Sequence, residues 1–253
     1  MDRRYSYFVS DVHLGLQLMD ADGRERRFVS FLRSLDPSST EGLYLLGDIF
    51  DFWYEYKHVV PKGFNRVFAA LQDLVDRGVK VFFMQGNHDI WTYHYFEDLG
   101  MTVLPQPWHM TIGGRRFCIG HGDGLGPVST GYRLMNGAFR NKVLQALFSC
   151  LHPTIAFAFG NSWSASRRRK HLAAGPYAFR GKDEPLWKFA EAEKAPDGSP
   201  VDIFIFGHLH SHVDVVLGSG ARFLMTRDWL PASEYVVFDS VTLTCEIMDC
   251  GLA

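Results

Sequence analysis

Compact apolar runs alternate with helically spaced apolar residues through the first hundred positions of the chain. Residues 5–10, 42–46 and 79–84 are short and almost continuously apolar, which is the pattern of buried strands. Between them, residues 24–35 and 64–75 place apolar side chains three and four positions apart, as one face of a helix requires. This alternation of strand, helix and strand predicts a partly parallel sheet with crossover helices.

The pattern beyond residue 100 predicts shorter strands. Residues 108–112 and 115–119 flank Gly113 and Gly114, which suit a two-residue hairpin turn. An apolar strand is expected over residues 201–206. Further short strands are expected at about 213–217, 222–226, 235–239 and 241–248.

The segment between these regular ends has a different composition. Leu134, Leu144 and Leu151 belong to helically spaced apolar positions, and residues 154–159 are almost wholly apolar. The stretch 127–182 holds nine Lys or Arg and no Asp or Glu. We therefore expect one domain, 1–253. Its core is residues 1–126 and 201–253, and residues 127–200 form a basic, apolar helical lid.

Composition limits the class of protein. Hydrophobic residues make up 47% of the chain and the formal net charge is −2, which supports a large core and excludes a disordered chain. No apolar run approaches the roughly 18 residues of a membrane-spanning helix, and the N-terminus shows no signal-peptide core. Four cysteines without paired spacing fit reduced thiols better than disulfides or a zinc ribbon. We expect a cytoplasmic protein that lies peripherally on the inner face of the cell membrane.

Polar clusters follow five of the predicted strands. They are Asp11-x-His13, Asp48, Asn87-His88, His121 and His208-x-His210. Ligand sites of open α/β sheets gather at the carboxyl ends of the strands, so these loops are expected to converge. Together they offer carboxylates, an amide oxygen and imidazoles, a ligand set that suits divalent transition metals. One bridging aspartate would allow two ions about 3.5–4 Å apart, as in two-metal phosphoester cleavage.

Each cluster has an ordinary structural interpretation as well. A polar pair after a strand is often a turn or a helix cap, and this holds for Asp11-x-His13 and for Asp48 alone. Alternate residues such as His208 and His210 point apart in extended chain unless a turn redirects them. Five such clusters in this order, each ending a strand, favour the metal site over five unrelated turns.

This set of motifs resembles the calcineurin-like metallophosphoesterase superfamily. The resemblance implies an α/β sandwich, with two mixed sheets flanked by helices and a dinuclear centre at one edge. It implies two divalent ions, Mn²⁺ first, with Fe, Zn or Mg as alternatives. By this resemblance one ion would be held by Asp11, His13, Asp48 and His210, and the other by Asp48, Asn87, His121 and His208. His88 would stabilise the transition state or protonate the leaving oxygen, and Asp89 would orient His88.

The sequence of the predicted lid indicates a narrower group of enzymes within the superfamily. Residues 131–133 and 139–148 resemble the helical lid of UDP-2,3-diacylglucosamine diphosphatases, and residues 47–53 resemble their second motif. This implies hydrolysis of UDP-2,3-diacylglucosamine to UMP and 2,3-diacylglucosamine 1-phosphate by metal-bridged hydroxide. However, His88 stands where these enzymes generally carry Arg. A soluble phosphodiesterase or nuclease of the superfamily is therefore an alternative, and a non-catalytic interaction module is a third.

The lid also supplies candidate substrate contacts. These are Arg167, Arg168, Arg169 and Lys170 for phosphates, with Trp53 and Tyr132 as aromatic candidates. The apolar stretch 154–159 could line an acyl groove or touch a bilayer. For the individual cations a solvated helix face is the competing interpretation. The expected partners are a nucleotide-activated glycolipid and a membrane surface, with no nucleic acid.

Overall fold

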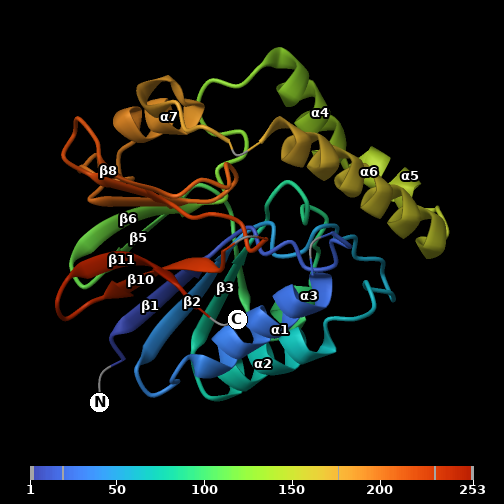
Figure 1. Ribbon diagram of the computed structural model, residues 1–253, viewed down its shortest axis with the longest axis horizontal. Coiled ribbons are helices and arrows are strands. Elements are labelled where there is room, and N and C mark those ends of the chain that lie inside the picture. Colours follow the sequence, from blue (N-terminus) through green and yellow to red (C-terminus); the bar gives the residue numbers. More distant parts are fainter. Residues whose placement is uncertain (1–2, 19, 176, 231, 252–253) are drawn as a thin grey trace.

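The computed structural model describes residues 3–18, 20–175, 177–230 and 232–251, and it leaves undescribed the side chains of residues 167, 170–172 and 174. Two mixed sheets pack face to face (Figure 1). Helices α1, α2 and α3 cover the outer side of one sheet, and α7 lies on the other (Figure 1). This arrangement confirms the expected two mixed sheets with flanking helices.

The first sheet has six strands, in the order β11-β10-β1-β2-β3-β4. Its strands are β1 (Tyr5–Val9), β2 (Thr40–Leu46), β3 (Lys80–Met84), β4 (Thr102–Leu104), β10 (Glu234–Asp239) and β11 (Thr244–Asp249). β1, β2, β3 and β4 pair in parallel, whereas β10 runs antiparallel to both β1 and β11. β1, β2 and β3 therefore end at the same edge, which is the edge that the sequence motifs follow.

The second sheet has five strands, in the order β5-β6-β7-β9-β8. Its strands are β5 (Trp108–Ile112), β6 (Arg115–Gly120), β7 (Ile203–Phe206), β8 (Val213–Val216) and β9 (Arg222–Met225). β6, β7 and β9 are parallel, and the β5–β6 hairpin turns at Gly113 and Gly114 as expected. β6 and β7 consequently deliver the residues after Gly120 and Phe206 to one edge.

Aromatic rings fill the space between the sheets. The ring of Phe8 stacks on Tyr44 with centroids 4.8 Å apart and on Phe117 with centroids 5.9 Å apart. Phe8 comes from the first sheet and Phe117 from the second, so their contact joins the two layers. Burial of such large rings contributes much of the hydrophobic stabilisation of a domain.

Amphipathic helices cover the outer side of the first sheet. In α1 (Ala21–Ser34) the buried residues Phe28, Phe31 and Leu32 have the spacing of one helix face, and the Asp20 carboxylate caps the first turn through Gly23 N–H. α2 (Asn65–Asp76) and the short α3 (Tyr95–Asp98) extend this layer. The three-residue strand β4 was not predicted, because so short a run carries little periodicity.

Three helices of the segment 127–200 project beyond the sandwich (Figure 1). They are α4 (Thr130–Arg140), α5 (Lys142–Ser149) and α6 (Pro153–Ala174), and from here on the lid means these three helices and not the whole expected segment 127–200. The later elements η1 (Gly181–Asp183) and α7 (Pro185–Ala192) lie apart from the lid, because Leu186 and Ala190 of α7 are buried against the second sheet. In the described part of the chain no single helix has the length and apolarity to cross a membrane; only the residues 142–149 and 153–166, bent by 120°, reach these criteria as a pair.

Candidate metal centre

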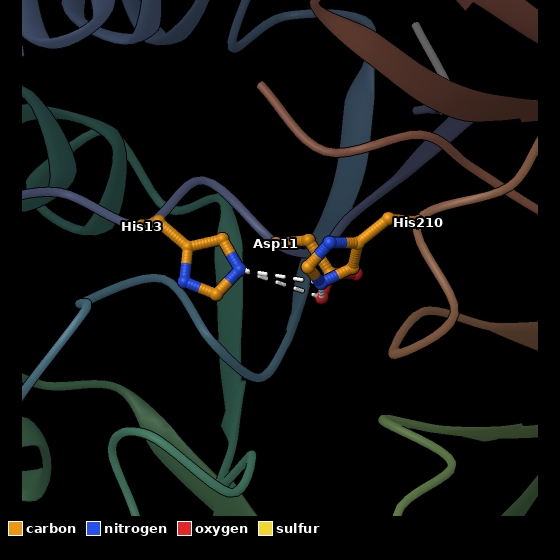
Figure 2. A group of neighbouring side chains, drawn as sticks. All are labelled: Asp11, His13 and His210. Atoms are coloured by element: carbon orange, nitrogen blue, oxygen red, sulfur yellow. Dashed lines mark hydrogen bonds and ion pairs between the residues drawn. The ribbon is translucent and has the colours of Figure 1, made fainter. Parts of the chain in front are cut away.

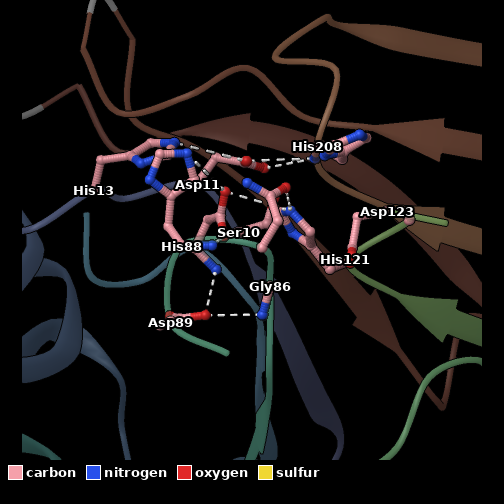
Figure 3. Close-up of polar contacts among 12 residues, drawn as sticks. Ser10, Asp11, His13, Gly86, His88, Asp89, His121, Asp123 and His208 are labelled. Carbon is pink, nitrogen blue, oxygen red and sulfur yellow. Dashed lines mark hydrogen bonds and ion pairs between the residues drawn. The ribbon is translucent and has the colours of Figure 1, made fainter. Parts of the chain in front are cut away.

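The polar side chains after the strands do converge (Figure 3). They reach the site through an unusual backbone, because non-glycine residues in the left-handed region are uncommon and concentrate at functional sites. Five of the expected ligands have such a positive φ: Asp11 (55°), His13 (50°), Asp48 (53°), His208 (73°) and His210 (52°). The left-handed turn also explains how His208 and His210 escape the alternation of an extended strand.

One group of ligand atoms joins the end of β1 to the loop after β7. Asp11 Oδ1 lies 3.1 Å from His210 Nε2 and 3.9 Å from His13 Nε2, and the two imidazole nitrogens are 3.4 Å apart (Figure 2). Asp11 and His13 are buried, and His210 is partly exposed. Three neutral or anionic donors this close together can share one cation.

A second group gathers around the Asp48 carboxylate. Asp48 Oδ2 lies 3.4 Å from His121 Nε2, and the Asn87 side-chain oxygen lies 3.2 Å from the same nitrogen. His208 lies beside them, with its ring centroid 5.2 Å from that of His121. Asp11, Asp48 and His121 also offer mutually close donor atoms, so Asp48 lies where it can serve both groups.

Outer contacts point the imidazoles inward. His121 Nδ1 lies 3.0 Å from the Leu46 carbonyl oxygen, to which it donates, so that the lone pair of Nε2 faces Asp48 and Asn87. His13 Nδ1 lies 3.4 Å from Asp51 Oδ1, which leaves His13 Nε2 directed at Asp11. Such partners fix the tautomer of a ligating histidine and raise its basicity.

Two glycines allow the main chain to approach the acidic side chains closely. A Cβ atom at Gly86 would overlap Asp48 Oδ1, and one at Gly207 would overlap Asp11 Oδ2. The backbone N–H of His88 donates to Asp48 Oδ1 at 2.8 Å, and that of His208 donates to Asp11 Oδ2 at 3.0 Å. Each carboxylate is thus fixed by the backbone of the next motif.

The charge balance of the site fits bound cations. Burial alone would raise the pKa of Asp48, but His121 and His88 outweigh it and hold this pKa well below its usual range. Burial likewise opposes the protonation of His121 and His210, yet Asp48 raises the pKa of His121 and Asp11 raises that of His210 to about 9. Without a metal, protons on these imidazoles therefore balance the carboxylates. A divalent ion can replace those protons, so the donor set and its charge both fit the metal.

The imidazole of His88 is held by the main chain of Asp51. Its Nδ1 lies 2.8 Å from the Asp51 carbonyl oxygen, to which it donates, and its Nε2 is 4.0 Å from Asp48 Oδ2. His88 therefore presents Nε2 to the site outside the two ligand groups around Asp11 and Asp48. Donor atoms of His13, Asp51 and His88 also lie close enough together to form a further candidate group for a cation.

Asp89 does something different from its expected role. Its carboxylate accepts backbone N–H bonds from Gly86 at 2.8 Å, Asp48 at 3.1 Å, Ile49 at 2.9 Å and Phe50 at 3.3 Å. Burial and the nearby Asp48 raise the pKa of Asp89 to about 7, whereas the four donors favour its charged form. None of its described hydrogen bonds reaches the His88 imidazole. The expectation that Asp89 orients His88 is therefore corrected, because its carboxylate clamps the loop that carries Asp48.

The two aromatic residues expected to contact substrate, Trp53 and Tyr132, lie in different environments. Trp53 is fully buried in the core and packs on Phe96 with ring centroids 5.1 Å apart, so its expected contact with substrate is corrected. Although Trp53 follows the second motif closely in the sequence, its ring points into the core and not toward the site. Tyr132 of α4 does face the site, and its hydroxyl donates to Asp123 Oδ2 at 3.0 Å.

Two neighbouring cations of the basic run of α6, Arg168 and Arg169, also lie in different environments. Arg168 is buried, and its Nη2 lies 2.9 Å from Asp228 Oδ2, whereas Arg169 is exposed to solvent. The side chains of Arg167 and Lys170 lie outside the described residues. A solvated face therefore describes Arg169, and Arg168 is a buried ion-pair partner.

Three acidic residues near the centre were missed by the sequence analysis. Asp51 contacts His13, Asp123 contacts Tyr132, and Asp228 lies 3.0 Å from His210 Nδ1. Asp51 and Asp123 lie within three residues of a recognised motif, which was an available signal. Asp228 follows strand β9, which was predicted, and the acid at its end was not connected with the other strand ends.

A cavity lies between the expected metal ligands and the lid. Its inner end includes Asn87, His88 and His208, and its walls are largely apolar. The wall residues come from the second and third motif loops and from α4 and α6: Phe52, Ile90, Trp91, Met135, Phe139, Phe159 and Trp163. The site can therefore hold a ligand that is anionic at one end and apolar along its length.

Comparison with known proteins agrees with this geometry. The sequence profile of the calcineurin-like phosphoesterase family matches residues 6–212. A UDP-2,3-diacylglucosamine hydrolase of Porphyromonas gingivalis is 35% identical over 96% of this chain and 97% of its own. Proteins of the same description from Stenotrophomonas maltophilia and Xanthomonas axonopodis are 30% and 32% identical, each over 88% of this chain and 90% of their own. The resemblance found in the strand-end motifs is thereby confirmed, and the chain belongs to the calcineurin-like phosphoesterase family.

Proposed function

We propose that this chain hydrolyses the pyrophosphate bond of UDP-2,3-diacylglucosamine and releases UMP and 2,3-diacylglucosamine 1-phosphate. The observation that carries the proposal is the cavity whose apolar walls lead directly to the ligands around Asp48. Relatives described as hydrolases of this lipid align with 96% and 88% of this chain, which supports the same substrate.

We propose that two divalent ions, Mn²⁺ in the first instance, are resident in the centre. Asp11, His13 and His210 would hold one ion, and Asn87, His121 and His208 the other, with Asp48 between them. When bound, such a pair supplies activated water near neutral pH and draws negative charge from the phosphoryl group. The residues of the chain fix the positions of the ligands.

His88 is the residue proposed to act on the substrate itself. Its Nδ1–H donates to the Asp51 carbonyl oxygen, so Nε2 is turned toward Asp48 and the cavity. From there the protonated form of His88 would donate a hydrogen bond from Nε2–H to a phosphoryl oxygen, or transfer that proton to the leaving oxygen. A positioned imidazole in this role contributes typically about 10²–10⁴ in rate.

The apolar walls are proposed to hold the acyl chains. Phe139 of α4 and Trp163 of α6 line the cavity from the lid side, and Trp91 lines it from the sandwich side. Trp91 Nε1 donates to the Phe139 carbonyl oxygen at 2.8 Å, which fixes the two walls relative to each other. Tyr132, at the cavity edge, would face the sugar or nucleotide end.

The outer face of the lid is proposed to rest on the membrane surface that contains the substrate. Large apolar side chains are exposed there, including Leu134 (71%), Val143 (67%) and Leu147 (62%). Arg140 and Lys142 are exposed beside them. An apolar face bordered by cations is typical of helices that lie in the interface of an anionic bilayer.

A soluble phosphodiesterase or nuclease is the second candidate function. His88, the form of the third motif found in general phosphodiesterases, is the observation that favours it. The apolar cavity is the observation against it, because a phosphate backbone is bound by cations rather than by apolar walls.

Product analysis separates the two candidates. We expect the chain with Mn²⁺ to cleave UDP-2,3-diacylglucosamine in detergent micelles far faster than bis(p-nitrophenyl) phosphate and to release UMP. The His121→Ala variant, with its circular dichroism unchanged, should release none. Equal rates on the two substrates would favour the general phosphodiesterase, and release of UDP would contradict the proposed scissile bond.

A further inference from the structure

A cation from the lid reaches the outer side of the proposed metal centre. Arg168 of α6 places Nη1 2.7 Å from His210 Nδ1 and Nη2 2.9 Å from Asp228 Oδ2. Asp228 Oδ2 is itself 3.0 Å from the same His210 nitrogen. Three side chains from three separate segments therefore meet behind one of the expected metal ligands.

The packing of α6 brings Arg168 to this point. Ala156, Gly160, Ser164 and Arg168 are four residues apart, share one helix face, and are all buried. A Cβ atom at Gly160 would overlap the Phe52 ring, so glycine permits the close approach of this face. One turn before Arg168, Ser164 Oγ lies 3.4 Å from His88 Nδ1. The buried face of α6 thus runs along the centre from His88 to His210.

The contact of Arg168 and Asp228 with His210 affects which imidazole nitrogen of His210 is available to bind a metal. If Nδ1–H donates to Asp228, the lone pair of Nε2 faces Asp11 and can bind a metal. Arg168 cannot donate to a nitrogen that already carries a proton, so in this metal-binding form its Nη1 turns away from Nδ1 while its Nη2 stays on Asp228 Oδ2. Arg168 therefore supports the metal-binding form of His210 through Asp228, which it keeps beside Nδ1.

We propose that Arg168 and Asp228 form a latch that couples docking of the lid to metal binding at His210. In the docked, loaded state Arg168 pairs with Asp228, and Asp228 holds Nδ1–H of His210. Arg168 and Asp228 are positioning residues in this proposal, because they act through His210. The inference rests on the proposed metal site and adds to it a link with the lid.

Coupling of this kind is reciprocal. If a docked lid raises the affinity for Mn²⁺, then Mn²⁺ must favour the docked lid by the same factor. Loss of Arg168 also removes the cation that holds the Asp228 carboxylate beside His210, so the carboxylate can turn away and the imidazole is held less firmly. Partners of ligating histidines typically change metal affinity by about 10–100-fold when they are removed.

The test measures Mn²⁺ binding and lid protection in the full chain, without substrate. Mn²⁺ affinity is taken from electron paramagnetic resonance titration, and the docking of α6 from hydrogen exchange of residues 153–174. In the wild type we expect Mn²⁺ to slow exchange in α6. In Arg168→Gln we expect affinity at the His210 site to fall about tenfold and this protection to be lost. Asp228→Asn should change both in the same direction.

Arg169→Gln is the matched control, because it removes the neighbouring exposed cation of the same helix. It should leave Mn²⁺ affinity and α6 protection at wild-type values. His210→Ala should lose one bound ion, which tests the metal site separately from the latch.

Wild-type affinity and protection in Arg168→Gln, together with loss of an ion in His210→Ala, would overturn the latch and keep the metal site. No Mn²⁺ binding by the wild type, or unchanged binding by His210→Ala, would overturn the metal site and the latch with it. If Arg168→Gln does not fold, Arg168→Lys is used, since it keeps the charge but lacks the fork that spans His210 and Asp228. Unchanged Mn²⁺ affinity in Arg168→Lys would count against the latch.

Discussion

The carboxylate of Asp89 accepts the backbone N–H of Asp48 at 3.1 Å, so one acidic residue holds the chain segment that carries another. Two further N–H groups of the same loop, those of Ile49 and Phe50, bind the same carboxylate. The contact brings two buried carboxyl groups close together. It is stable because N–H donors face Asp89, and because imidazoles and, when bound, metal ions face Asp48.

Replacing Asp89 by Asn should loosen this loop. The amide group presents N–H where backbone donors need an acceptor, so at least one buried N–H loses its partner at a cost of about 1–3 kcal/mol. We expect the free energy of unfolding in urea to fall by that amount and Mn²⁺ affinity to fall with it. Asp73→Asn, at an exposed position on α2, should change neither by more than about 0.5 kcal/mol. A fully stable Asp89→Asn variant would contradict the clamp.

His88→Gln should separate catalysis from metal binding. Gln keeps a polar side chain but cannot transfer a proton, so kcat should fall by about 10²-fold or more. Because His88 lies outside both ligand groups, Mn²⁺ affinity should stay at the wild-type value. His121→Ala should instead lose metal and activity together. If His88→Gln also loses an ion, His88 is a ligand and its proposed role is wrong.

Metal binding should release protons at pH 7. The pKa of His121 is raised well above its usual value by Asp48, and that of His210 to about 9 by Asp11, so both imidazoles are protonated in the metal-free protein at this pH. Ligation requires their neutral forms, and Mn²⁺ affinity should therefore rise with pH between 6 and 9. Calorimetric titration in two buffers of different ionisation enthalpy measures the release. Identical heats in both buffers would show that no proton leaves.

The outer face of the lid should bind anionic vesicles. Leu147→Asp places a charge on an apolar side chain that is 62% exposed, so it should weaken vesicle binding while the fold and hydrolysis of bis(p-nitrophenyl) phosphate persist. Val216→Asp alters a side chain of similar exposure, 67%, on β8. That variant should bind vesicles like the wild type. Equal weakening in both variants would mean that the lid face has no special part in binding, and co-sedimentation with phosphatidylglycerol vesicles distinguishes the cases.

Trp53→Ala should act on stability. The ring is fully buried among Phe50, Phe68 and Phe96, so its removal should cost about 3–5 kcal/mol. Trp53→Phe should recover much of this stability and leave KM for the lipid substrate unchanged. A raised KM in a stable Trp53→Phe variant would restore the role in substrate contact that the structure corrects.

The sequence allowed the strand ends and their chemistry to be predicted because both are local. A strand such as 79–84 shows its apolar run, and the residues after it must lie at the end of the sheet. Asp89 shows the limit of this reasoning. The family resemblance implied a contact with the His88 imidazole, whereas three of the four backbone partners of Asp89, in residues 48–50, lie about forty positions earlier in the chain and depend on how two loops pack.

The same limit applies to the basic run of the lid. Four successive cations suggested one shared role, but a helix turns adjacent residues to different sides, so Arg168 is buried and Arg169 is exposed. Only the packing of α6 decides which cation meets Asp228. Pairing of this kind depends on three segments at once and leaves no pattern in any one of them.

The contacts of Gly86 with Asp48 and of Gly207 with Asp11 have a consequence for how this centre can change. Even alanine, the smallest substitution, would push an acid out of position at either glycine. The positions of the Asp11 and Asp48 carboxylates are therefore determined mainly by the path of the main chain. Surrounding side chains, His88 among them, can be exchanged to suit another substrate while the pair of acids stays where it is.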